Sequence, residues 1–207
     1  MNNIDCIFFD IGSTLVDETC AYEHRFRDSI AGTDISYEKV YNKAVEFYRQ
    51  GKKGDLEAFK FYNLPKSDWR KEDEILYPDT AKVLDSLSQK YNLGIIANQN
   101  LGTKKRLEKF GILKYFNIVV SSAEEGAAKP NPEIFDIAVC RAGTYADRCI
   151  MIGDRLDNDI IPAKKLRFKT VWVRQGFARF VPVGYGSKWA DIIFENIGAV
   201  SLLKNII

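Results

Sequence analysis

The sequence predicts an α/β fold: a mainly parallel sheet with a small helical insert after the first strand. From about residue 79 onward, short apolar runs alternate with helical patterns, an order typical of parallel sheets with right-handed crossovers. Before them, residues 19–75 show helical periodicity and almost no strand pattern. The chain of 207 residues is 46% hydrophobic and 13% aromatic, which is enough for a real core.

The first predicted strand ends on a carboxylate. Residues 6–9 form an apolar run rich in β-formers, Asp10 follows directly, and Gly12 and Ser13 then break the pattern. Open α/β sheets bind ligands at the carboxyl ends of their strands. Taken alone, an Asp in this place is more simply explained as a turn residue, so its role depends on the rest of the chain.

Residues 17–75 are expected to form a separate helical unit, with the sheet domain made of residues 1–16 and 76–207. One helix is expected to begin near Ser36, and Asp55 is expected to cap another, which Leu64 and Pro65 end. The first of these helices carries apolar positions at i, i+3 and i+4, namely Tyr37, Val40, Tyr41, Ala44, Val45 and Tyr48. Its aromatic residues are expected to pack rather than to bind a cofactor.

The remaining elements alternate in type. Strands are expected over 93–97, 116–120, 148–152, 169–173 and 191–194, and helices are expected to begin at Asp79, Thr103, Asn131, Ile160 and Ile197. Gly111 suits a left-handed helix end, and Pro132 suits a first helical turn. Residues 174–189 are rich in Gly, Pro and aromatics and are expected to form an irregular loop.

Composition excludes several classes of function. A formal net charge of +2 gives no electrostatic case for nucleic acid or an anionic membrane as partner. Without a leader-like segment or a long apolar stretch, a cytoplasmic location is expected. The four cysteines lack C-x-x-C spacing and are expected to be reduced, with Cys6 and Cys149 in strands. His24 is the one histidine, which argues against a histidine triad or a His-rich zinc site.

Polar groups follow several of the predicted strands, namely Asp10, Asn98, Lys129, and Asp154 with Asp159. Two acidic sites and a lysine on one sheet edge suit magnesium-assisted phosphoryl transfer, in which Asp10 would attack phosphorus. Asp10, the Gly12 carbonyl and Asp154 would supply the oxygen ligands that Mg²⁺ prefers. Lys129 would hold Asp10 and the phosphoryl oxygens. Asn98 and the turn that contains Ser13 and Thr14 are expected to contact the substrate phosphate.

Four stretches together resemble the haloacid dehalogenase-like (HAD) hydrolase superfamily. They are FFDIGSTLVD (8–17), LGIIAN (93–98), KPNPEIF (129–135) and IGDRLDNDI (152–160), in the order and at the spacing of that family. The resemblance implies a Rossmann-like core with a helical cap after the first strand. It also implies that Asp10 is the nucleophile, Lys129 a charge clamp and Asp154 a magnesium ligand, with Asp159 a ligand or a residue that supports one. The expected substrate is a small phosphorylated metabolite.

The sequence departs from the pattern of the phosphatases it resembles. They usually carry an acid/base Asp two residues after the nucleophile, where this chain has Gly12, and loss of a positioned acid typically costs about 10²–10⁴-fold in rate. Ala97 replaces a hydroxyl residue, and Ser13 and Arg167 replace glycines. Arg167 is therefore expected to have a positive φ. Aryl and acyl phosphates are expected to be cleaved far better than alkyl phosphates, unless Asp17, Glu18 or His24 supplies the proton.

Two alternatives to a magnesium-dependent phosphohydrolase stay open. One is a catalytically degenerate member that binds a phosphorylated ligand or a partner, and the other is a dehalogenase-type hydrolase. The dehalogenases of the superfamily lack the Gly-Asp pair that this chain keeps at 153–154. Members that cleave phosphonates use a lysine of the cap, and surface placement is expected for the cap lysines here, Lys39, Lys43, Lys52, Lys53 and Lys60. The same placement is expected for Arg25, Arg27 and Arg49, any of which would otherwise contact an anionic substrate.

Overall fold

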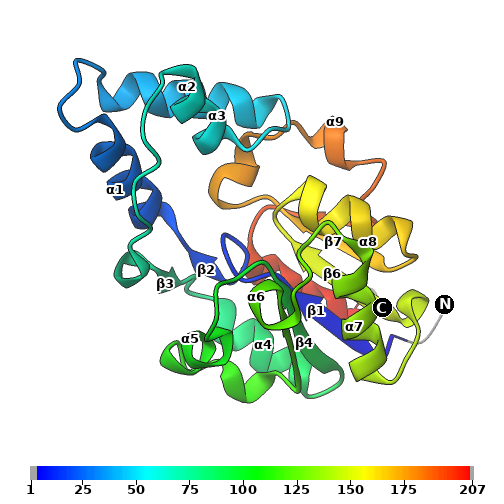
Figure 1. Cartoon of the computed structure of the whole chain (residues 1–207). Helices are drawn as coiled ribbons and strands as arrows, with labels where there is room; N and C mark the ends of the chain where they lie inside the picture. The colour runs from blue at the N-terminus through cyan, green and yellow to red at the C-terminus, as the bar shows by residue number, and fades with distance from the viewer. Residues whose placement is uncertain (1–3, 206–207) are drawn as a thin grey trace.

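A computed structural model of the chain describes residues 4–205, and its centre is a six-stranded parallel sheet (Figure 1). The strand order is β5-β4-β1-β6-β7-β8. The strands are β1 (Cys6–Phe9), β4 (Asn92–Ala97), β5 (Ile118–Ser121), β6 (Cys149–Gly153), β7 (Lys169–Val173) and β8 (Ile192–Phe194). Ile7 of β1 lies opposite Leu93 on one side and Ile150 on the other. The predicted α/β class and parallel sheet are confirmed.

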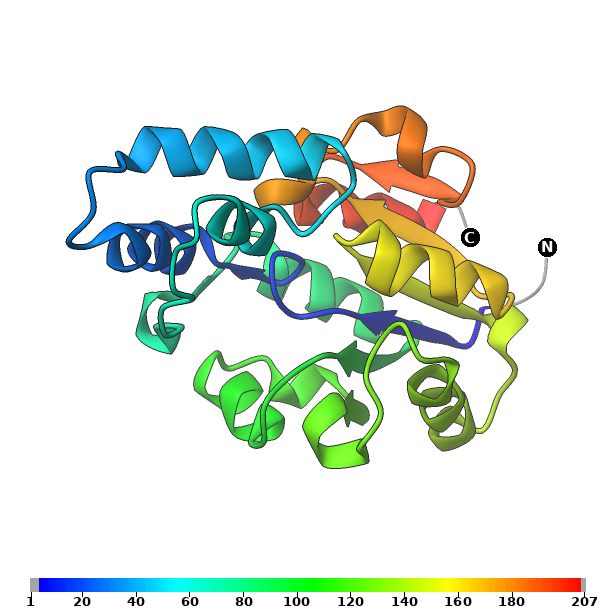
Figure 2. The same cartoon turned by 45° about the horizontal axis from the view of Figure 1, so that its top comes forward.

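Helices cover both faces of the sheet because successive side chains of its strands alternate between the faces (Figure 2). Ile7 and Phe9 pack against α4 (Thr80–Ser88), α5 (Thr103–Lys109) and the 3₁₀ helix η6 (Ile197–Asn205). Cys6 and Phe8 pack against α7 (Pro132–Ala142) and α8 (Ile161–Lys165). The predicted helix near residue 197 is thus a 3₁₀ helix. Short helices fill the connections: η2 (Leu113–Tyr115), α6 (Ser122–Glu125) and η3 (Ala146–Arg148).

Between β1 and α4 the chain forms a group of helices with a core of its own. They are α1 (Thr19–Ile30), α2 (Tyr37–Arg49), α3 (Gly54–Phe61) and the 3₁₀ helix η1 (Lys71–Asp73). Phe26 lies at the centre of this core with Val40 and Phe59. In Figure 1 these helices lie beyond one end of the sheet. We call residues 17–75 the helical insert; these bounds, and its status as a domain, stay a prediction.

The chain enters and leaves the helical insert through two short strands that the sequence pattern did not predict. β2 (Val16–Asp17) pairs antiparallel with β3 (Ile75–Leu76), with Val16 opposite Leu76 and Asp17 opposite Ile75. Two residues are too few for an alternating pattern to be recognised. The pairing places the two connections side by side.

The expectation that Asp55 caps α3 is wrong. The helix begins at Gly54, with Lys53 rather than Asp55 as its N-cap residue. Gly54 lets α2 and α3 approach closely, since a Cβ there would lie 2.1 Å from the Ala44 carbonyl oxygen. Asp55 is instead fully buried inside the helix. Its carboxylate accepts a hydrogen bond from Tyr48 Oη at 3.0 Å and lies 3.5 Å from Arg25 Nη1.

Residues 174–189 are more ordered than the expected irregular loop. They contain the 3₁₀ helix η5 (Gly176–Phe180) and the short helix α9 (Val183–Gly186). Phe177 of η5 stacks on Tyr48 of α2, with ring centroids 4.6 Å apart, and meets Tyr22 of α1 edge-on at 4.9 Å. An aromatic side chain from the sheet domain therefore anchors the helical insert over the sheet edge.

Several local predictions are confirmed. The Asn131 side chain accepts a hydrogen bond from Glu133 N at the start of α7, with Pro132 in the first turn. Gly111 has a φ of 70° and Arg167 a φ of 74°. All four cysteines are free, with Cys6 in β1 and Cys149 in β6. Across residues 4–205, we find no helix that is both long and apolar enough to span a membrane.

Candidate active site

Lys129 joins Asp10 to Asp159 at the carboxyl end of the sheet. Asp10 follows β1, and its amide donates to the Ile152 carbonyl of β6 at 2.9 Å. Lys129 Nζ donates to Asp10 Oδ1 at 2.7 Å, to Asp159 Oδ1 at 2.6 Å and to the Ile96 carbonyl at 2.8 Å. Burial opposes the ammonium charge, but the two carboxylates outweigh it and raise the pKa of Lys129. Lys129 is therefore charged and fixed in place by three acceptors.

Asn98, expected to contact the substrate, also holds the backbone of Lys129. It follows β4, and its Oδ1 accepts from the Lys129 amide at 2.7 Å while its Nδ2 donates to the Lys129 carbonyl at 2.8 Å. This pair of bonds fixes the loop between α6 and α7. Asn98 also lines the cavity above Asp10.

Asp154 and Asp159 come from one local structure. Asp154 follows β6, and Asp159 lies in a single π-helical turn, η4 (Leu156–Ile160), which leads into α8, the helix expected from Ile160. A Cβ on Gly153 would lie 2.4 Å from Asp159 Oδ2, so glycine is needed there for the carboxylate to reach the sheet edge. The same oxygen accepts from Arg155 N at 3.0 Å.

The carboxylates of Asp10, Asp154 and Asp159 fit a divalent cation. One oxygen of each lies within 4.8 Å of the others. Burial, aided by the charges of Asp159 and Asp10, raises the pKa of Asp154 well above its usual range. Burial also raises the pKa of Asp159 to about 6, although Lys129 lowers it. The raised pKa values indicate that too little positive charge lies near these buried carboxylates to stabilise their ionised forms. A bound cation would supply that charge, and Mg²⁺ prefers oxygen ligands.

Above these groups lies a cavity of about 290 Å³. Gly12 and Ser13 line it from the sheet side, and Tyr22, Arg25, Tyr48 and Lys53 line it from the helical insert. Arg25 is only 7% exposed, and its Nε has no hydrogen-bond partner within residues 4–205. Burial lowers the pKa of Lys53. Arg25 is thus buried, against the expectation of surface placement, whereas Lys53 is exposed as expected although it also lines the cavity.

The turn after Asp10 differs in part from the expected phosphate cradle. Thr14 is fully buried, and its amide donates to the Ile11 carbonyl at 3.3 Å, so this amide is already paired. The Thr14 hydroxyl donates to Asp154 Oδ1 at 3.4 Å. Ser13 has a φ of 52° and lines the cavity. We therefore keep Ser13 and Gly12 as candidates for substrate and metal contact, and assign Thr14 to support of Asp154.

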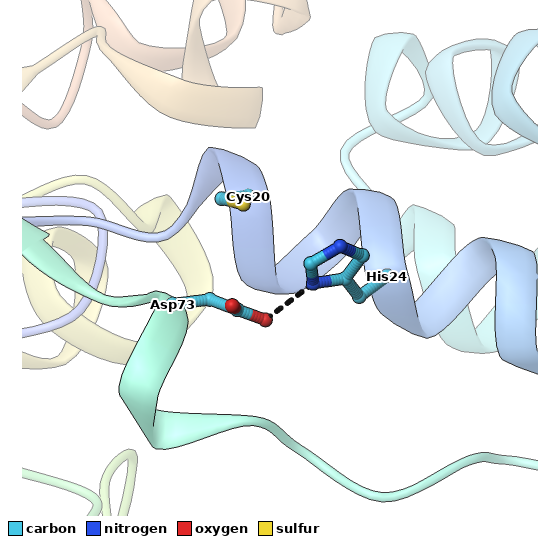
Figure 3. Close-up of side chains that lie close together, drawn as sticks. All are labelled: Cys20, His24 and Asp73. Atoms are coloured by element: carbon cyan, nitrogen blue, oxygen red, sulfur yellow. Dashed lines mark hydrogen bonds and ion pairs between the residues drawn. The ribbon is translucent and has the colours of Figure 1, made fainter.

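Asp17 and His24, two of the three alternative proton donors, lie away from the cavity. Asp17 Oδ1 accepts from the Thr19 amide at 2.9 Å. His24 Nδ1 lies 2.6 Å from Asp73 Oδ2, beside Cys20 on the preceding turn of α1 (Figure 3). These pairings occupy the outer side of α1 and β2, and neither residue is among those described that line the cavity.

Glu18, the third candidate, does line the cavity. Its side chain is 13% exposed. Ser13 Oγ donates to its Oε2 at 2.9 Å. Burial raises the pKa of Glu18 to about 7, although the bond from Ser13 and the charge of Arg106 lower it.

The fold is of the Rossmann-like α/β class, and Lys129 and three carboxylates lie together at its sheet edge. A family model for haloacid dehalogenase-like hydrolases matches residues 4–167, and the chain belongs to this family. Its relatives are phosphatases: the chain is 31% identical over 196 residues to glyceraldehyde 3-phosphate phosphatase of Pyrococcus abyssi, a match that covers 84% of this chain and 82% of that protein. It is a phosphatase-like hydrolase of the family.

Solved structures of family members share the fold over the whole chain. The HAD phosphatase of Thermococcus onnurineus matches with a TM-score of 0.67 at 24% identity and covers 98% of this chain and 97% of its own. A haloacid dehalogenase-like hydrolase of Streptococcus pneumoniae matches with a TM-score of 0.72 at 18% identity and covers 100% of both chains.

Proposed function

We propose that the protein is a magnesium-dependent phosphohydrolase that acts on a small phosphorylated metabolite through an aspartyl phosphate on Asp10. The observation that carries the proposal is the arrangement at the sheet edge, where Lys129 bonds Asp10 and Asp159 beside the buried Asp154. A nucleophilic carboxylate needs positive charge around it before it can approach a phosphate dianion. Lys129 supplies one such charge.

The other residues of the site complete the chemistry. Asp10, Asp154, Asp159 and the Gly12 carbonyl would hold Mg²⁺, which when bound neutralises charge on the phosphoryl group. Asp10 attacks phosphorus, and Lys129 keeps the attacking carboxylate oriented and pairs with phosphoryl oxygens. Water then cleaves the aspartyl phosphate and releases inorganic phosphate.

The cavity supports a small anionic substrate. Its volume of about 290 Å³ lies at the lower limit of the range of small-molecule sites. Arg25 and Lys53 add positive charge on the side of the helical insert. The relatives named glyceraldehyde 3-phosphate phosphatase act, by name, on a molecule of this class. We expect a phosphorylated compound of a few carbons, possessing polar groups that Arg25 or Lys53 can bind.

A screen for phosphate release over many phosphate esters, with and without Mg²⁺, tests the proposal. The expected result is release that requires Mg²⁺ and is abolished by Asp10→Asn. Asp136→Asn is the matched control, since Asp136 is an exposed aspartate on α7. Tight ligand binding without release would favour the degenerate binding protein, and halide release without metal would favour a dehalogenase; either result would refute the proposal.

A further inference from the structure

The carboxyl group of Glu18 occupies the space that a side chain on residue 12 would fill. A Cβ built on Gly12 would lie 2.6 Å from Glu18 Oε1 and 2.9 Å from both Cδ and Oε2. All three atoms of the carboxyl group therefore lie within 2.9 Å of this one position. Glycine at residue 12 leaves this place free for Glu18, because a larger residue would displace its carboxyl group.

The surrounding residues hold Glu18 in that place. It precedes the first turn of α1, where its carbonyl accepts from the Tyr22 amide at 2.9 Å. Ser13 Oγ donates to its Oε2 at 2.9 Å. Ser13 makes this bond from a left-handed conformation, with a φ of 52°, which residues other than glycine rarely adopt. Two departures from the family pattern, Gly12 and Ser13, thus both accommodate the carboxyl group of Glu18.

A purely structural role for Glu18, as partner of Arg106, fits the distances poorly. Arg106 Nη2 lies 2.8 Å from Glu74 Oε2 but 3.9 Å from Glu18 Oε1. Arg106 Nε also donates to the same Glu74 oxygen at 2.9 Å. Glu74 therefore already neutralises Arg106, and the Glu18 carboxyl group is left facing the cavity that Asp10 also lines.

We propose that Glu18 is the acid/base catalyst of this hydrolase and takes the role that an Asp on residue 12 would otherwise have. The inference rests on the proposed phosphohydrolase function. It also means that the residue supplying the proton comes from the entrance to the helical insert rather than from the turn after the first strand.

The proton balance of the two steps is as follows. Asp10 forms a bond to phosphorus, the bond from phosphorus to the leaving oxygen breaks, and that oxygen receives the proton of the Glu18 carboxylic acid. Water then attacks the aspartyl phosphate and gives a proton to the Glu18 carboxylate, while the bond between phosphorus and Asp10 breaks. The products are an alcohol, inorganic phosphate and the regenerated pair of Asp10 carboxylate and Glu18 acid.

The decisive experiment is a leaving-group series on alkyl and aryl phosphates. In wild type, kcat/KM should depend only weakly on the leaving group. A strong dependence would be expected if Gly12 left the enzyme without a proton donor. Glu18→Gln should show a steep one, with a loss of about 10²–10⁴-fold on alkyl phosphates and a much smaller loss on the best aryl leaving groups. Glu18→Asp should recover part of the loss, and Asp17→Asn, the neighbouring acid outside the cavity, should behave as wild type.

Intact-mass measurement of the quenched reaction gives a second readout. The Glu18→Gln variant should accumulate an adduct of one phosphoryl group with a good aryl leaving group, because the second step lacks its base. A structural role would instead lower turnover equally for all leaving groups without an adduct, and that result would overturn the proposal. Failure of the phosphohydrolase function itself looks different, as wild type would then release no phosphate or Asp10→Asn would remain active.

Moving the acidic residue from position 18 to position 12 gives a test that a folding defect in the single variant cannot explain. Gly12→Asp alone should not raise turnover on alkyl phosphates, since the new side chain competes with Glu18 for the same place. Gly12→Asp combined with Glu18→Ala should restore alkyl phosphate turnover well above that of Glu18→Ala. No recovery in a double variant with the wild-type circular dichroism spectrum would count against the proposal.

Discussion

Lys129 balances part of the negative charge at the sheet edge. Its side chain is 2% exposed and bonds two carboxylates and a carbonyl. A buried ion pair contributes little net stability compared with apolar residues of the same shape, but removing one partner leaves the other charge buried without compensation. Stability should therefore depend strongly on Lys129, in addition to its proposed role in catalysis.

We predict that Lys129→Met lowers the free energy of unfolding by about 3–5 kcal/mol. The physical reason is that Asp159, whose side chain is 1% exposed, loses its cation. Urea unfolding followed by circular dichroism in the absence of Mg²⁺ measures the loss. The double variant Lys129→Met with Asp159→Asn should regain part of it, since the uncompensated charge is removed. Equal instability of the single and double variants would contradict this account.

We also predict that Arg167→Gly raises the melting temperature. Arg167 ends α8 with a φ of 74°, and the Phe168 amide donates to the Ala163 carbonyl at 3.0 Å, as in a Schellman motif. Its side chain is 81% exposed, and its contact with Asp147 is long, 3.9 Å, so little is lost by removing it. Relief of about 1 kcal/mol of backbone strain corresponds to roughly 2–4 °C.

Lys165→Gly is the matched control, because Lys165 is exposed and lies inside the same helix. Glycine there should lower stability by about 0.5–1 kcal/mol. Scanning calorimetry of the two variants therefore separates relief of strain at Arg167 from any general effect of glycine. A lower melting temperature for Arg167→Gly would show that the side chain contributes more than its exposure indicates.

At the scale of elements, helices and strands with a repeating apolar pattern could be predicted from the sequence. Elements that form because of a tertiary contact could not. The strands of the sheet and helices such as α4 and α7 carry apolar periodicity that burial imposes. The pair β2 and β3, the π-helical turn at Asp159 and the helix η5 carry no such period. They exist because Leu76 meets Val16, Asp159 packs over Gly153, and Phe177 enters the core of the helical insert.

The site follows the same division. Asp10, Lys129, Asp154 and Asp159 could be predicted because each stands in a recognisable stretch near the end of a strand. Glu18 and Lys53 could not be singled out, since their roles depend on how the helical insert lies over the sheet edge. The spacing of residues in the sequence does not indicate that Gly12 and the carboxyl group of Glu18 lie close together. Only the packing of α1 against the turn after β1 brings the two together.

The placement of Lys53 at the start of α3 gives a prediction for substrate binding. Lys53 lines the cavity opposite Asp10, and burial lowers its pKa because the ammonium group is partly removed from water. Lys53→Gln should raise KM for the physiological substrate several-fold with a smaller effect on kcat, because the proposed contact of Lys53 with the substrate lies away from the reacting phosphate. Steady-state kinetics on the best substrate of the screen measures the two constants.

The control for this variant is Lys60→Gln, since Lys60 is an exposed lysine of the same helix outside the cavity. Its KM should equal that of wild type. An unchanged KM in Lys53→Gln would mean that the substrate does not reach the insert side of the cavity. A fall in kcat alone would instead point to a role of Lys53 in the chemical steps.

At the scale of the whole molecule, the proposed metal site is a product of folding. Its carboxylates come from the end of β1, the end of β6 and the turn that follows β6, and parallel pairing of these two strands brings them within 4.8 Å of one another. An unfolded chain holds these groups far apart and has no comparable site. A ligand that binds only the folded state raises the free energy of unfolding.

Mg²⁺ should therefore raise the melting temperature of the wild-type protein without any substrate present. At a concentration of about 100 times Kd the stabilisation is roughly 2.7 kcal/mol, which corresponds to several degrees for a chain of this length. Asp154→Asn should lose most of this shift, whatever its own melting temperature, since it removes an oxygen anion from the site. Asp136→Asn on the surface of α7 should keep it. Equal melting temperatures with and without Mg²⁺, or a full shift in Asp154→Asn, would mean that the carboxylates are not the metal ligands and that Lys129 alone supplies positive charge to the phosphoryl group.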